Sequence, residues 1–225
     1  MTELLLIRHA TNEYVDTGKL AGRLPGVHLN EYGKAQAKAL GERLASAPLK
    51  AVYSSPMDRT LETAQAVVAH HPGLTVQVLE GVNELDIGVW KGEAINTLNQ
   101  RKLWDLVQTF PSRVRFPGGE TFRQAQLRAV DAIETVAGLH PRETVAIVSH
   151  ADVIALVLAH YLGAHLDAFQ RITVSTASIS VIRLGHARPM IVGINDTSHC
   201  PPPPKKDESS SPTRVGNGAS GRAAG

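Results

Sequence analysis

Short apolar runs and stretches with helical spacing alternate along the first 195 residues of the chain. Residues 4–7 (Leu-Leu-Leu-Ile) and 145–148 (Val-Ala-Ile-Val) are continuous apolar runs bounded by polar residues. Such runs are typical of strands buried on both faces in a parallel or mixed sheet. Shorter apolar or alternating segments predict further strands over residues 51–53, 74–79, 172–184 and 190–194.

Helices are predicted between these strands. Apolar residues three and four positions apart indicate amphipathic helices over residues 31–47, 56–70, 93–110 and 120–137, and residues 151–162 form a strongly apolar helix closed by Gly163. Because strands and helices alternate, the pattern predicts an α/β fold. Residues 13–30 are rich in Gly and Pro, which predicts a long loop suited to closing over a pocket.

Histidines follow both continuous apolar runs at the point where each strand ends. Arg8 and His9 come directly after residues 4–7, and His150 follows residues 144–149. In open α/β sheets, ligands bind in the crevice outside the carboxyl ends of the strands. A cation and an imidazole at that edge indicate an anionic substrate.

A further cation is expected at the same edge. Ser55 as N-cap, Pro56 at the first helical position and Asp58 three residues after the cap form a helix-start signal. This signal places Arg59 in the first turn of the helix, where backbone N–H groups also attract anions. A surface arginine is the commoner alternative for this residue taken alone.

Two carboxylates lie in an unusual loop. In residues 83–92, Glu84 and Asp86 stand beside glycines and Trp90. A partly apolar pocket raises the pKa of a carboxyl group by desolvation and prepares it as a general acid. Both carboxyls are candidates for that role, and an ordinary acidic loop is the alternative.

The composition favours one domain and excludes some partners. With 225 residues, of which 43% are hydrophobic, the chain has ample material for a core. The formal net charge is +2, and the last 26 residues hold four basic and two acidic residues, so residues 1–199 are formally neutral. A neutral body argues against a nucleic-acid partner, which would require a clustered basic surface.

The end of the chain has a different composition from the rest. From Cys200 on, Pro, Ser and Gly dominate, so we expect a domain over residues 1–199 and a disordered tail over residues 200–225. The single cysteine can form no disulfide within the chain. No apolar run approaches the roughly 18 residues that span a membrane, and Arg8 interrupts the N-terminal run at once. We therefore expect a cytoplasmic protein without a membrane partner.

The cations and histidines point to phosphoryl chemistry. Two arginines beside a neutral imidazole would bind a phosphoryl group and, being cations, keep the imidazole deprotonated. This makes His9 a plausible nucleophile. The sequence contains no GxSxG elbow, no phosphate loop ending in Gly-Lys-Ser/Thr and no HExxH pair.

Several motifs occur in order along the chain. They are Leu6-Ile7-Arg8-His9-Ala10, Leu29-Asn30-Glu31-x-Gly33-x-x-Gln36-Ala37, Tyr53-Ser54-Ser55-Pro56-x-x-Arg59, Glu84-x-Asp86-x-Gly88-x-Trp90-x-Gly92, Pro117-Gly118-Gly119-Glu120 and Val148-Ser149-His150. This series resembles the signature of the histidine phosphatase superfamily, also called the phosphoglycerate mutase-like family, over roughly residues 3–195. The resemblance implies a three-layer α/β/α sandwich with a mostly parallel central sheet.

The resemblance also implies a role for each site residue. His9 would attack phosphorus to form a phosphohistidine, while Arg8, Arg59 and His150 would hold the phosphoryl oxygens. Glu84 matches the family's acid and would protonate the leaving oxygen and later deprotonate water. No metal or other cofactor is implied, because the cationic side chains supply the charge stabilisation.

The chain departs from the family's pattern at three places. Ala10 replaces a usual Gly, and we expect its φ to be negative because a methyl group does not fit a positive φ there. Ala151-Asp152 follows His150 where many members have Gly-Gly. Thr11-Asn12 stand where Glu-Thr or Gln-Thr is common in the family, and Asn12 is a candidate phosphate or substrate contact.

Three functions remain open at this point. The quick passage from Glu84 into the next helix resembles the phosphatase branch, so we predict metal-independent hydrolysis of a small phosphomonoester from a phosphorylated metabolite. One alternative is a cofactor-dependent phosphoglycerate mutase, which shields the phosphohistidine from water until the product rebinds. Another is an inactive member that binds a phosphorylated ligand. The sequence leaves the oligomeric state open, a homodimer included.

Overall fold

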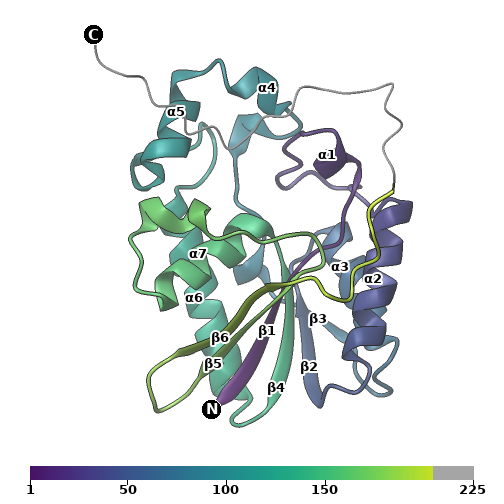
Figure 1. Ribbon diagram of the computed structural model, residues 1–225. Coiled ribbons are helices and arrows are strands. Elements are labelled where there is room, and N and C mark those ends of the chain that lie inside the picture. Colours follow the sequence, from purple (N-terminus) through teal and green to yellow (C-terminus); the bar gives the residue numbers. More distant parts are fainter. Residues whose placement is uncertain (205–225) are drawn as a thin grey trace.

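The two continuous apolar runs pair with each other in the middle of one sheet. In this computed structural model, which describes residues 1–204, β1 (Thr2–Arg8) lies parallel to β4 (Thr144–Ser149). The sheet has six strands in the order β3-β2-β4-β1-β5-β6 (Figure 1). The remaining strands are β2 (Leu49–Ser54), β3 (Val76–Val78), β5 (Ile179–Leu184) and β6 (Met190–Asp196). The first four strands are parallel, whereas β5 pairs antiparallel with both β1 and β6.

Helices cover both faces of the sheet. The main ones are α2 (Glu31–Leu44), α3 (Asp58–Val68), α6 (Phe122–Leu139) and α7 (Ala151–Tyr161). Alternate residues of β1 enter two separate core clusters: Leu5 and Ile7 pack with α2 and α3, and Leu4 and Leu6 pack with α6 and α7. Figure 1 shows α2 and α3 on one side of the sheet and α6 and α7 on the other. The predicted α/β/α architecture is therefore confirmed.

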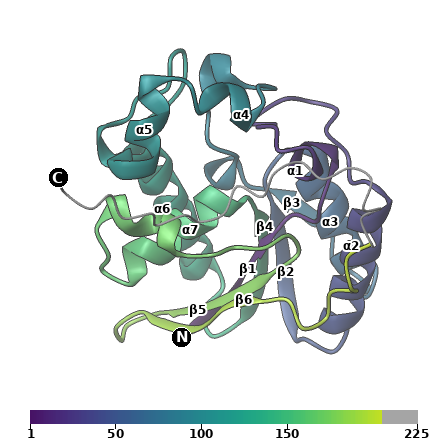
Figure 2. The same cartoon turned by 45° about the horizontal axis from the view of Figure 1, so that its top comes forward.

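Short elements gather over the carboxyl ends of β1, β2 and β4. They are α1 (Glu13–Asp16), α4 (Ile95–Leu98) and α5 (Lys102–Thr109), with 3-10 turns η1 (Glu80–Val82), η2 (Gly88–Trp90), η3 (Pro111–Arg113) and η4 (Leu166–Arg171). Figure 2, in which this edge of the sheet comes forward, shows α1, α4 and α5 spread across it. The predicted loop over residues 13–30 thus contains one short helix, α1, capped by the Asn12 side chain.

The predicted N-cap of the Arg59 helix is wrong. Helix α3 begins at Asp58, and its N-cap is Met57, which makes no side-chain cap hydrogen bond. Ser55 still belongs to the edge of the sheet, because its backbone N–H donates to the Val148 carbonyl oxygen at 3.0 Å. The Asp58 carboxylate accepts instead from the backbone N–H of Gly26 at 2.7 Å. Tertiary contacts therefore use both residues that the local motif assigned to capping.

Two other predicted elements are shorter than their patterns. The helical pattern over 93–110 divides into α4 and α5, and Leu98 of α4 and Val107 of α5 both belong to the larger core cluster. The strand predicted over 172–184 begins only at Ile179. Its first half bends because Ala177 has a φ of 57° and its N–H donates to the carbonyl oxygens of Arg8 and His9.

The end of the described chain touches the domain. Cys200 packs against the small core cluster that holds Ala10, and the Tyr32 hydroxyl donates to the Pro201 carbonyl oxygen at 2.9 Å. The greater part of the predicted disordered tail, residues 205–225, lies outside the described residues. Among residues 1–204, no helix is both long and apolar enough to cross a membrane.

Candidate active site

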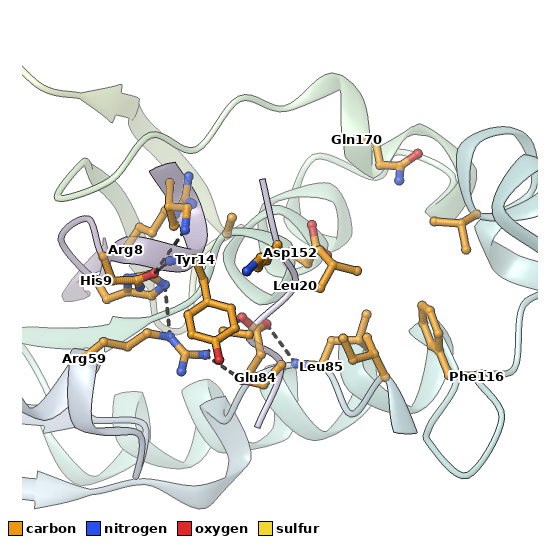
Figure 3. A pocket seen from close by; sticks show the side chains of 18 of the residues that line it. Arg8, His9, Tyr14, Leu20, Arg59, Glu84, Leu85, Phe116, Asp152 and Gln170 are labelled. Atoms are coloured by element: carbon orange, nitrogen blue, oxygen red, sulfur yellow. Dashed lines mark hydrogen bonds and ion pairs between the residues drawn. The ribbon is translucent and has the colours of Figure 1, made fainter. Parts of the chain in front are cut away.

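A cavity of about 290 Å³ opens at the carboxyl edge of the sheet. Its inner end is lined by Arg8, His9, Asn12, Arg59 and Glu84, whereas His150, predicted as a phosphate contact, is fully buried against Glu84 and does not itself line the cavity. We call these six residues the inner end, and we call the outer wall the group Leu20, Trp104, Val107, Gln108, Phe116 and Gln170. Figure 3 shows Arg8, His9, Arg59 and Glu84 gathered at one end and Phe116 and Gln170 at the other. The cavity therefore has one charged end and one mostly apolar wall.

His9 lies directly after β1 and is 4% exposed. Its Nδ1 is 2.7 Å from the Ala10 carbonyl oxygen, which can only accept a hydrogen bond, so Nδ1 carries the proton and Nε2 keeps its lone pair. Burial, together with the positive charges of Arg59 and Arg8, holds the pKa of His9 well below its ordinary value. Its Nε2 thus has a free lone pair at neutral pH.

Arg59 connects the members of the inner end. From the first turn of α3, its Nε lies 3.4 Å from His9 Nε2, and its Nη2 donates to the Gly22 carbonyl oxygen at 2.8 Å and to Glu84 Oε2 at 3.5 Å. Burial lowers the pKa of this guanidinium, and the nearby Glu84 carboxylate opposes that shift. The contacts hold a buried cation beside the His9 nitrogen that retains its lone pair.

Arg8 is held by residues 172–178, which were predicted as part of a strand but form a bent segment before β5. Its Nη1 donates to the Val174 carbonyl oxygen at 2.7 Å, across 166 residues of sequence. Ala177 caps the end of β1 in the same segment through its backbone N–H. The bend over residues 172–178 therefore orients the first of the two arginines.

His150 lies at the end of β4 and is completely buried. The Ser55 hydroxyl lies 2.7 Å from its Nε2, and its Nδ1 lies 3.3 Å from both Glu84 Oε2 and Arg59 Nη2. Its ring meets the His9 ring edge to face, with centroids 5.4 Å apart. Burial and the charge of Arg59 hold the pKa of His150 well below its ordinary value, so its ring too is uncharged at neutral pH.

Of the two carboxylates in the 83–92 loop, Glu84 lines the cavity and Asp86 does not. The Asp86 carboxylate accepts from the Gly88 N–H at 3.1 Å and lies 3.9 Å from Arg23 and from Lys91. The sequence left both carboxyls as candidates from the loop alone, and the direction of their side chains separates them. The geometry thus agrees with the acid that the family resemblance implied.

Three charged residues, Arg23, Arg128 and Glu120, fix the backbone at Glu84. This function was not assigned to them from the sequence alone. Arg23 Nε and Arg128 Nη2 donate to the Glu84 carbonyl oxygen at 2.7 and 3.1 Å. Glu120 accepts from both arginines and from the Asp86 N–H. The motif Pro117-Gly118-Gly119-Glu120 was the available signal, because it brings Glu120 against residues 84–88.

Asn12 contributes one side-chain group to the site and one to the fold. Its Oδ1 accepts from the backbone N–H groups of Tyr14 and Val15 at 3.0 and 3.1 Å and so caps α1. Its Nδ2 is buried and has no hydrogen-bond partner among residues 1–204. Ala10, two residues earlier, does not have a positive φ, as expected from its methyl group.

Within the described residues 1–204, three buried donors of the cavity lining have no hydrogen-bond partner: Arg8 Nε, Asn12 Nδ2 and Arg59 Nη1. Buried polar groups are nearly always hydrogen-bonded, so a cluster of donors without partners indicates a ligand rich in acceptors. A phosphoryl group supplies such acceptors together with a charge opposite to that of the arginines. The inner end is therefore suited to a phosphate.

A metal fits the same place less well. Nitrogen and oxygen atoms of His9, Glu84 and His150 lie within 4.8 Å of one another, as the ligands of a metal ion would. However, Arg59 contacts this group and the charge of Arg8 acts on both histidines, and two neighbouring cations repel a third positive charge. The charges at this end thus favour an anion.

Comparison with known proteins places the chain in a family. The profile described as "Histidine phosphatase superfamily (branch 1)" matches residues 4–197. The phosphoserine phosphatase 1 of Hydrogenobacter thermophilus is 33% identical over 201 residues, which are 88% of this chain and 94% of that protein. The chain therefore belongs to the histidine phosphatase superfamily, branch 1, and is an enzyme of the phosphatase type.

Two further relatives agree with this assignment. A metal-independent phosphoserine phosphatase of Arabidopsis thaliana is 28% identical over 203 residues, covering 88% of this chain and 83% of that protein. The solved structure of Bacillus stearothermophilus YhfR has a TM-score of 0.84 and 27% identity, and the match covers 89% of this chain and all of that one. The same fold thus extends over nearly all of the described residues.

Proposed function

We propose that this enzyme hydrolyses phosphoserine, or a closely related small phosphomonoester, without a metal and through a phosphohistidine on His9. The observation that carries the proposal is the unprotonated His9 Nε2 beside Arg59, with Glu84 and His150 within contact distance of each other. A cavity of about 290 Å³ suits a small substrate. Two relatives are named as phosphoserine phosphatases, and one of them as metal-independent.

Substrate binding places the phosphoryl group among the donors of the inner end. Arg8 and Arg59 donate to its nonbridging oxygens, the Nδ2 of Asn12 adds a neutral donor, and His150 supports them from behind through its contacts with Arg59 and Glu84. These donors are held in place before the substrate enters, so they stabilise negative charge in the transition state without rearranging.

The first chemical step transfers the phosphoryl group to the enzyme. His9 Nε2 attacks phosphorus, a nitrogen–phosphorus bond forms, and the bond between phosphorus and the ester oxygen breaks. Glu84, in its protonated form, gives its proton to the leaving oxygen, which departs as an alcohol. The Nδ1–H bond to the Ala10 carbonyl oxygen keeps the ring oriented during the attack.

The second step returns the enzyme to its starting state. Glu84, now a carboxylate, takes a proton from a water molecule that attacks phosphorus. The nitrogen–phosphorus bond breaks, and inorganic phosphate leaves. His9 is again neutral, and Glu84 is again protonated, so one water is consumed for each ester hydrolysed.

The test measures phosphate release from a panel of phosphomonoesters with EDTA present, using the wild type, His9→Ala and the control His186→Ala, which removes an exposed histidine of the β5–β6 turn. The panel contains phosphoserine, and it contains 3-phosphoglycerate with and without its bisphosphate. We expect turnover of phosphoserine that survives EDTA, that is unchanged in His186→Ala and that falls by at least about 10⁴-fold in His9→Ala.

Other outcomes identify the alternatives. Isomerisation of 3-phosphoglycerate without phosphate release would point to a phosphomutase. Binding of phosphorylated compounds without turnover would point to an inactive member. Loss of activity with EDTA, restored by a divalent metal, would contradict the metal-free mechanism.

A further inference from the structure

The cavity holds a second carboxylate that the proposed chemistry does not use. Asp152 is the second residue of α7, two positions after His150, and it lines the cavity. Figure 3 shows it between the inner end, where His9 lies, and Gln170 of the outer wall. Within residues 1–204, its carboxylate makes neither a hydrogen bond nor an ion pair with a protein side chain, and the residue is exposed to the cavity.

This position is unfavourable for an acidic side chain. The protein around the cavity disfavours the charged carboxylate and raises the pKa of Asp152 to about 6, and the neighbouring Glu84 shifts it in the same direction, while Arg8 opposes both. A phosphate dianion at the inner end would add a further repulsion. A carboxyl group that lines a cavity and whose charged form the surrounding protein disfavours is a candidate for a functional residue.

The start of a helix offers one structural reason for an acid here, because the partial positive charge of the helix N-terminus favours carboxylates. That reason does not require the side chain to face the cavity. It also predicts that Asp152 stabilises the protein. The raised pKa predicts instead that Asp152 destabilises the protein at neutral pH. A carboxyl group whose pKa is higher in the folded protein than in the unfolded chain is harder to ionise after folding.

We propose that Asp152 binds a cationic group on the leaving-group side of the substrate, namely the ammonium group of phosphoserine. The proposal rests on the function proposed above and deepens it. An unpartnered carboxylate between the phosphoryl site and the outer wall would meet a positive charge close to the ester oxygen, and the ammonium group of phosphoserine is two carbons from that oxygen. A phosphomonoester without a cation would leave Asp152 unpaired and repelled.

The experiment compares phosphoserine with its des-amino analogue, 3-phosphooxypropanoate. The ratio of the two kcat/KM values is measured for the wild type, for Asp152→Asn, and for Asp131→Asn, which removes an exposed carboxylate from α6 far along the chain from the cavity lining. We expect Asp152→Asn to lower the preference for phosphoserine by about 10- to 100-fold. Asp131→Asn should keep the wild-type ratio.

A binding measurement makes the test independent of turnover. In a His9→Ala background, calorimetry gives the Kd of both compounds with and without Asp152→Asn. The same loss of preference is expected there. The melting temperature is a third readout, and we expect it to stay equal or to rise in Asp152→Asn.

The outcomes separate this inference from the proposed function. Hydrolysis of phosphoserine with an unchanged ratio in Asp152→Asn would overturn the role of Asp152 and leave the hydrolase intact. A wild type that prefers the des-amino analogue would do the same. Equal losses on both compounds together with a lower melting temperature would assign Asp152 to helix stability and also overturn the inference. Failure of the wild type to act on any phosphomonoester would instead refute the proposed function, while the Kd ratio would still decide about Asp152.

Discussion

The two ends of the cavity are built in different ways. At the inner end, Arg8 ends β1 and is followed by His9, and His150 follows β4, which pairs with β1. Arg59 lies in the first turn of α3, and Glu84 lies in a loop that Arg23 and Arg128 hold. The side chains of the inner end are mostly buried and contact one another at 3.3 to 3.5 Å. The outer wall comes from the 13–30 loop, α5, the loop before α6 and η4, and it includes exposed residues such as Gln108 and Gln170.

This difference separates reaction type from substrate choice. Groups that must act on phosphorus need fixed positions, which paired strand ends, a helix start and a loop held by two arginines supply here. Groups that recognise the leaving alcohol lie on connecting segments, which can vary without disturbing the sheet. Family membership therefore follows from the inner end, and the identity of the substrate depends on the outer wall and Asp152.

The largest effect is expected from the acid at the inner end. Glu84→Gln should lower kcat for phosphoserine by about 10² to 10⁴, because the serine oxygen is a poor leaving group and needs a proton. For an activated aryl phosphate the loss should be much smaller. Steady-state kinetics on both substrates provide the measurement.

Asp86→Asn is the matched control for that prediction. Asp86 is two residues from Glu84, but its carboxylate binds the Gly88 N–H and faces Arg23 and Lys91. We expect similar, small losses on both substrates. If Asp86→Asn showed the strong dependence on the leaving group and Glu84→Gln did not, the two roles would have to be exchanged.

An intermediate effect is expected at the outer wall. Replacing Gln108 and Gln170 together with Ala should raise KM for phosphoserine by up to about tenfold and leave kcat nearly unchanged, since side chains that bind ground state and transition state equally act on KM alone. Gln100→Ala, outside the cavity lining, serves as the control. A fall in kcat of the same size as the rise in KM would show that the two ends are not separable.

The smallest effect concerns pH and again involves the inner end. At pH values below 6.5, the ordinary pKa of histidine, His9 and His150 bind protons in the unfolded chain but stay unprotonated in the folded protein, because their folded-state pKa values are lower. Stability should therefore fall as the pH falls through 6.5, by up to about 1.4 kcal/mol per histidine and pH unit, or several degrees in Tm over one unit. Calorimetry between pH 7.5 and about 5.5 measures this slope.

His9→Asn should make that slope shallower, because one of the two neutral histidines is gone. NMR of the imidazole nitrogens offers a direct check. Protonation of His9 near its ordinary pKa in the folded protein would contradict the neutral nucleophile on which the proposed mechanism depends.

The sequence located the elements of the inner end correctly where local pattern decides structure. Two apolar runs followed by histidines became β1 and β4, neighbours in the sheet, since a buried strand is recognisable from its own residues. The same holds for α7, which ends before Gly163 with a φ of 66°. The sequence pattern was misleading where a side chain binds a residue that is distant in the sequence. Ser55 is an example, because its hydroxyl contacts His150 instead of capping a helix.

The amino-acid sequence by itself thus determined the fold class and the family, because motif order and apolar periodicity are properties of short segments, and it singled out His9, Arg8, Arg59 and His150 as candidates for one site. Only the tertiary structure showed that Glu84 and not Asp86 faces the cavity, bent residues 172–178 around Arg8 and, among residues 1–204, left Asp152 lining the cavity without a side-chain partner. These results depend on contacts between side chains that are up to 166 residues apart in the chain. Such contacts are set by how the layers pack, and no local pattern encodes them.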